Sequence, residues 1–88
     1  MESYLVEVYL PRSRGDQAGG IESRARVAAE ELSPDGALIR YVRTTFLPDD
    51  ETCFHFFEAA SADVVEEAVR RANFGRGRVV RAVESAGS

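Results

Sequence analysis

Apolar and polar positions along the chain follow two periods, one of two residues and one of three to four. A period of two, carried by β-branched and aromatic residues, is typical of strands. It predicts strands over residues 4–10, 38–47, 52–58 and 78–83. The longer period predicts one helix over residues 21–32 and a second between the cap residues Ser61 and Asn73.

Turn-forming residues separate these segments. Pro11 ends the first strand because proline cannot donate a hydrogen bond to a neighbouring strand, and a loop follows over residues 12–20. Pro34 ends the first helix, since the residue before a proline avoids the helical conformation. Pro48-Asp49-Asp50 joins the second and third strands as a hairpin turn.

The predicted order of elements, βαββαβ, indicates a fold. Right-handed strand–helix–strand connections lead to a ferredoxin-like α+β sandwich. This is a four-stranded antiparallel sheet with two helices on one face and the first and third strands at its centre. We expect the 88 residues to form one domain, with a frayed tail over residues 84–88. A chain of this length buries a modest core, so association with a second copy would stabilise it.

Composition narrows the classes of function. The net charge of −4 argues against nucleic acid, whose phosphates require positive charge. The 11 positive residues are all arginine, which excludes Schiff-base and P-loop lysines. No apolar run is long enough to cross a membrane, and residues 1–4 lack the features of a signal peptide. The single cysteine favours a reducing compartment, so we expect a cytoplasmic protein.

Function is expected on the sheet face that the helices leave uncovered, here called the open face. We expect Val6, Val8, Phe54 and Phe56 to face the helices. Alternation then places three sets of residues on the open face: Leu5, Glu7 and Tyr9; Tyr41, Arg43 and Thr45; and Cys53, His55 and Phe57. Arg81 is a further candidate from the last strand.

These assignments bring together a candidate site for a small ligand. Glu7 beside His55 would form an acid/base pair, because a neighbouring carboxylate raises the pKa of an imidazole. Arg43 would hold an anion, and three aromatic residues would form apolar walls. The predicted ligand-binding residues are therefore Glu7, Tyr9, Tyr41, Arg43, His55 and Phe57.

His55 and Cys53 also form a possible metal-binding pair, two residues apart on one strand. Such a pair suits nickel, copper or zinc, but two ligands fall short of a complete site unless a symmetric dimer doubles them. The alternative is a buried, unreactive thiol at Cys53. We interpret His55 as a candidate ligand for nickel or another divalent transition metal. The predicted function requires no cofactor.

Three functional hypotheses follow. The preferred one is a homodimeric, non-enzymatic protein that holds a small ligand or a metal ion between its subunits. The second is a dimeric α/β-barrel enzyme, an isomerase or monooxygenase, in which His55 moves a proton in a small aromatic or carbonyl substrate. The third is a structural or regulatory interaction module whose open face is simply a dimer interface.

The chain also resembles a family of small bacterial ferredoxin-like proteins. The resembling segments are Ile39 to Thr44, Pro48 to Thr52, Phe57-Glu58-Ala59, Glu66 to Phe74 and Arg78-Val79-Val80. This family is known mostly as a domain of unknown function, and its characterised member is a nickel-binding, nickel-responsive actinomycete protein. The resemblance implies a dimer and nickel binding. Family members often have histidine where Arg43 and Val69 stand and cysteine where His55 stands, so only His55 matches as a candidate ligand.

Overall fold

The structure is a computed structural model that describes residues 1–83 and 85. The predicted tail over residues 84–88 therefore lies almost wholly outside the described residues. The elements follow one another as the hydrophobic pattern predicts: β1 (Glu2–Tyr9), α1 (Ala18–Leu32), β2 (Ile39–Leu47), β3 (Thr52–Ala59), α2 (Ala62–Ala72) and β4 (Arg78–Ala82). Short 3₁₀ helices over Arg12–Gln17 and Ser33–Asp35 precede and follow α1.

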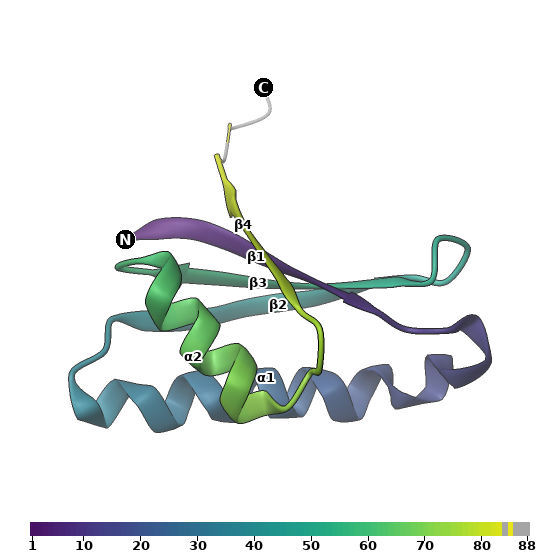
Figure 1. The fold of residues 1–88 in the computed structure, drawn as a ribbon, viewed down its shortest axis with the longest axis horizontal. Coiled ribbons are helices and arrows are strands. Elements are labelled where there is room, and N and C mark those ends of the chain that lie inside the picture. Colours follow the sequence, from purple (N-terminus) through teal and green to yellow (C-terminus); the bar gives the residue numbers. More distant parts are fainter. Residues whose placement is uncertain (84, 86–88) are drawn as a thin grey trace.

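The sheet has the strand order β2-β3-β1-β4, and all three neighbouring pairs are antiparallel. Both helices lie on the same side of it, and β4 crosses at the edge beside β1 (Figure 1). The ferredoxin-like α+β fold, with the first and third strands at the centre, is confirmed. No helix among residues 1–83 and 85 is long and apolar enough to cross a membrane.

The segment before α1 differs from the prediction. A loop is predicted over residues 12–20, but 3₁₀ turns with a kink at Arg14 occupy Arg12–Gln17, and α1 begins at Ala18, three residues before Ile21. Gln17 and Ala18 both have right-handed helical backbone angles, so the 3₁₀ segment runs directly into the first turn of α1. The two glycines of that turn lower its helix propensity without preventing the helix.

The core lies between the sheet and the helices. Val6 and Val8 of β1 are buried there, as predicted. Ala25 and Ala28 of α1 and Val65 of α2 bring the helices close to the sheet, since their side chains are small or compact. The stripes that pack on the sheet are Ile21, Ala25, Ala28, Ala29 and Leu32 of α1 and Val65, Ala68, Val69 and Ala72 of α2.

Candidate functional site

The open face carries only part of the residue set that the sequence predicted there. Leu5 and Glu7 pair across the strands with Phe56 and Phe54, and Tyr9 pairs with Thr52. These side chains alternate with the buried Val6 and Val8, so the prediction for β1 is confirmed. Arg43 and Thr45 of β2 also lie on this face, because they pair with Phe56 and Phe54.

The prediction for β3 is wrong, because the alternation of its inward and outward side chains, here called the phase of the strand, is shifted by one residue. Cys53, His55 and Phe57 are all buried against the helices, and His55 has no exposed surface. Phe54 and Phe56, expected in the core, lie on the open face instead. Glu58 explains the difference, because it shares their phase, and burying all three would place an unpaired carboxylate in the core.

Tyr41 and Arg81 also depart from the prediction. A β-bulge at Val42, between Tyr41 and Arg43, shifts the phase of β2, so Tyr41 faces the helices while Arg43 does not. Its ring meets Phe57 edge-on, with the ring centroids 5.9 Å apart. In β4, Arg78 rather than Arg81 pairs with Glu7 on the open face.

The predicted His55–Glu7 pair does not form. His55 pairs with Val6, and Glu7 pairs with Phe54, so the two side chains leave adjacent strands on opposite faces of the sheet. The Glu7 carboxylate lies 3.7 Å from the guanidinium of Arg78 instead. The open face therefore contains no acid/base pair that includes His55.

His55 lies within a buried chain of polar groups. Its Nδ1 lies 2.7 Å from Thr44 Oγ1, which lies 2.8 Å from the Tyr41 hydroxyl. Its Nε2 lies 3.8 Å from Cys53 Sγ. Phe74 stacks on the imidazole, with the ring centroids 4.5 Å apart and the planes 8° from parallel. Both ring nitrogens thus have partners, and one ring face is covered.

This environment favours the neutral imidazole. Burial, with a smaller contribution from the Arg24 guanidinium, lowers the pKa of His55 from 6.5 to about 4. Burial also raises the pKa of the Cys53 thiol. Both pKa shifts disfavour a thiolate–imidazolium pair, so neither side chain is activated for chemistry near neutral pH.

The same geometry bears on the metal hypothesis. His55 and Cys53 offer two donor atoms, which lie beneath the helices where a second copy at the open face cannot add ligands. Within residues 1–83 and 85, no group of three or more histidine, cysteine, aspartate or glutamate side chains is placed to hold a metal ion. These residues do not fit a nickel site.

Apolar side chains form a row across the open face. Phe56, Leu5 and Val80 pair in sequence across three strands, and all three are half-buried. Tyr9 is 69% exposed, and Val42 and Leu47 are each 38% exposed at the bulge and at the end of β2. Half-buried strand side chains on a bare sheet face are those that a covering partner would remove from water.

Charged side chains surround this row, and most are paired. Arg40 forms an ion pair with Glu58, and Arg78 with Glu7. Arg43 differs: its guanidinium lies 4.1 Å from the centroid of the Phe56 ring, and no carboxylate among residues 1–83 and 85 lies within ion-pair distance. Arg43 therefore remains able to bind an anion.

Arg43 borders a depression of about 240 Å³ on the open face. Ser3, Val42, Phe56 and Glu58 are among its other lining residues. Sequence reasoning missed Phe56 and Glu58 here because it placed β3 in the wrong phase. The Arg40–Glu58 pair, directly across β2 and β3, is the signal that would have corrected the phase.

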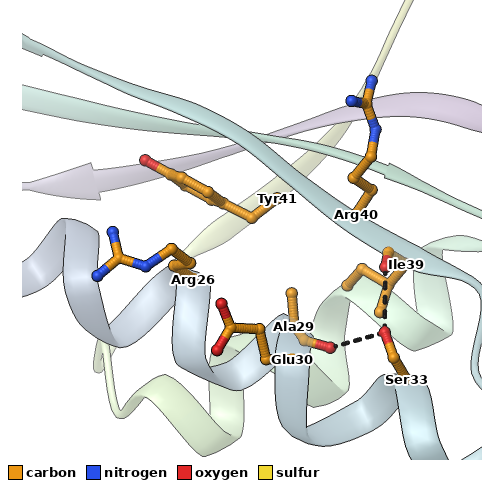
Figure 2. Close-up of a pocket in the computed structure, with 7 residues that line it drawn as sticks. All are labelled: Arg26, Ala29, Glu30, Ser33, Ile39, Arg40 and Tyr41. Carbon is orange, nitrogen blue, oxygen red and sulfur yellow. Dashed lines mark hydrogen bonds between the residues drawn. The ribbon is translucent and has the colours of Figure 1, made fainter.

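A second hollow, a cleft of about 320 Å³, lies between α1 and the edge strand β2 on the helix side of the sheet. Ala29, Ile39 and the ring of Tyr41 give it an apolar lining, and Arg26, Glu30, Ser33 and Arg40 surround this lining (Figure 2). Sequence reasoning did not predict this cleft, because its walls come from a helix and a strand far apart in the chain, and the bulge at Val42 turns Tyr41 toward the helix side.

The chain matches no protein-family model and no curated protein. Its function is therefore inferred from the fold and from the geometry of its surfaces.

Proposed function

We propose that this protein is a small, non-enzymatic binding protein that forms a homodimer through its open face and holds a small organic anion beside Arg43. The observation that carries the proposal is the guanidinium of Arg43, which rests on Phe56 beside a depression of about 240 Å³. Neighbouring Arg40 and Arg78 are neutralised by carboxylates, whereas Arg43 is not. The depression is smaller than a drug-sized pocket, which limits the ligand to a small molecule.

The apolar row supports a second copy of the chain as the partner. Leu5, Phe56 and Val80 form a continuous strip with charged residues of both signs beside it. A surface with both signs of charge can be complementary to itself about a two-fold axis. Sheet-to-sheet packing would bury the strip and cover the depression, which would strengthen the attraction between Arg43 and an anion.

The resemblance to the bacterial nickel-binding family supports the dimeric arrangement. Nickel is not part of the proposal, because His55, the one matching ligand, is buried on the helix side of the sheet with Cys53 as its sulfur neighbour. An enzymatic role for His55 is not proposed either. It faces away from Arg43 and the open face, where the substrate would bind.

Benzoate, a small planar carboxylate, tests the anion site by isothermal titration calorimetry. We expect Arg43→Gln to weaken benzoate binding about tenfold, the effect of losing a charge-assisted hydrogen bond. Arg76→Gln is the matched control, because it removes the same charge from an exposed residue outside the sheet. Absence of saturable binding, or equal losses in the two variants, would contradict an anion site at Arg43.

Sedimentation equilibrium tests the dimer separately. Leu5→Glu places a charge at the centre of the apolar row, and we expect it to convert the dimer into a monomer. Val27→Glu is the control, because Val27 is 45% exposed on the helix side of the molecule and should leave the dimer intact. A wild-type monomer at all concentrations, or dissociation by both variants, would contradict the proposed interface.

A further inference from the structure

The cleft between α1 and β2 is independent of the open face. It lies on the helix side of the sheet, so a partner at the open face would leave it accessible. Its two walls differ in character: β2 contributes Ile39 and the ring of Tyr41, and the other wall contributes Ala29 with the polar side chains of Arg26, Glu30 and Ser33, about one turn apart. The cleft therefore presents an apolar surface beside charged groups, the usual composition of a small-molecule site.

The charges around the cleft leave one group uncompensated. Arg26 is held by Glu22, with 2.6 Å between the nitrogen and the oxygen. Arg40 pairs with Glu58, and Figure 2 shows its guanidinium pointing away from the cleft. Glu30 forms no ion pair within residues 1–83 and 85, and its carboxylate points from α1 toward the space beside the Tyr41 ring (Figure 2). The unmatched charge at the cleft is negative.

Two further groups in the cleft suit an N–H donor. The Ser33 hydroxyl donates to the carbonyl oxygen of Ala29 at 3.2 Å, so its lone pairs can accept a hydrogen bond from a ligand. The Tyr41 ring offers an aromatic face, which attracts a cation. Its hydroxyl already bonds to Thr44, which orients the ring over the cleft.

We propose that this cleft binds a small molecule that carries a primary ammonium group on a short apolar chain. The ammonium group pairs with Glu30 and donates to Ser33, while the apolar chain packs on Ile39 and Ala29 beneath the Tyr41 ring. A simple alkylamine and an α-amino acid with an apolar side chain share this chemistry. Only the amino acid also carries a carboxylate, and Arg26 is the cation that lies beside the cleft to receive it.

Three probes that share one isobutyl group separate these contributions in a ¹H–¹⁵N NMR titration. 3-Methylbutylamine carries the ammonium alone, 4-methylpentanoate the carboxylate alone, and leucine both. We expect the amine to give saturable shifts at Ser33, Ile39 and Tyr41, and the acid to give none. Tighter binding of leucine than of the amine would identify an amino acid as the ligand, and weaker binding a simple amine.

Glu30→Gln is the decisive variant, with Glu31→Gln as its control. Both lie in the last turn of α1, and each substitution removes one negative charge, but Glu31 lines a different hollow on another side of the helix. We expect the first to weaken amine binding about three- to fivefold and the second to change it less than twofold. Equal losses in the two variants, binding of the acid as tightly as the amine, or no saturable shift with any probe would overturn the proposal.

Discussion

His55 is held in its neutral form by what surrounds it. Thr44 and Cys53 contact its two ring nitrogens, Phe74 covers one face, and Arg24 adds a positive charge nearby. The result is a histidine that completes the packing of the core and satisfies its polar neighbours. Residues of this kind contribute to stability when neutral and oppose it when protonated.

His55 therefore predicts a specific dependence of stability on pH. Its pKa is about 4 in the folded protein against 6.5 when unfolded, so the unfolded state binds more protons between these values. The stabilisation is complete above pH 6.5 and is lost as the pH falls toward 4. Because His55 is the only histidine, we expect the free energy of unfolding to fall by about 2 kcal/mol between pH 7 and pH 5.

Urea unfolding across this pH range measures the change, and an NMR titration of the imidazole measures the pKa directly. A pKa of 6 or above, or a stability that does not change between pH 7 and pH 5, would be inconsistent with the buried, neutral histidine.

Cys53 makes a second prediction at the residue scale. It has no exposed surface, and burial raises the pKa of its thiol, so the reactive thiolate is scarce and shielded. We expect a thiol reagent to modify the native protein at least about a hundredfold more slowly than the urea-unfolded chain, since reaction requires opening of the core. The absorbance of the chromophore that the reagent releases measures both reaction rates, and comparable rates would show that Cys53 is accessible.

At the scale of the elements, the end of α2 determines the position of Phe74. Asn73 adopts a left-handed conformation, with φ 57° and ψ 50°, and its N–H bonds to the carbonyl of Arg70. Asparagine tolerates this conformation better than most residues, and glycine tolerates it best. The turn directs the following residue, Phe74, onto the imidazole of His55.

Substitutions at Asn73 test this turn. We expect Asn73→Ala to lower the free energy of unfolding by about 1 kcal/mol and Asn73→Gly to leave it unchanged or slightly higher. Glu66→Gly, in the exposed middle of α2, should cost about 1 kcal/mol, which separates the effect of the turn from that of glycine itself. Urea unfolding gives all three values, and a stability ranking with alanine above glycine at position 73 would contradict the assignment.

The elements also show where sequence reasoning succeeds and where it stops. The strand and helix order was predictable because each element has a clear period and a turn signal at its end, such as Pro48 and Asn73. The faces of β3 were not predictable in this way, because phenylalanines occupy both alternating sets of positions. Only Glu58 indicates which set faces away from the helices. The bulge at Val42 leaves no local signature, yet it determines which face Tyr41 and Arg43 occupy.

The candidate site was accordingly predicted in part. Glu7, Tyr9 and Arg43 lie on the open face, whereas Tyr41, His55 and Phe57 lie on the opposite face. One step of phase in a strand exchanges every side chain between the two faces, so a single wrong choice moved His55 and Phe57 together. Physical reasoning recovers the correct phase once the Arg40–Glu58 pair is considered.

At the scale of the whole molecule, the fold has two layers. The sheet forms one layer and both helices form the other, so the sheet is covered on one face only (Figure 1). The apolar row through Leu5 and Phe56 lies on the uncovered face. A second copy packed face to face would turn a two-layer structure into a four-layer one with both sheets inside.

This arrangement predicts that thermal stability depends on protein concentration. If the folded state is a dimer and the unfolded state a monomer, mass action favours folding as concentration rises. We expect Tm to rise by about 3–5 °C for each tenfold increase in concentration, from RT ln 10 per dimer and the unfolding entropy of a protein of this size.

Calorimetry at several protein concentrations measures this slope of Tm. Leu5→Glu should abolish the slope and Val27→Glu should preserve it, because only Leu5 lies on the open face. A wild-type Tm that is constant across the series would mean that the two-layer monomer is stable alone, with its apolar row in water.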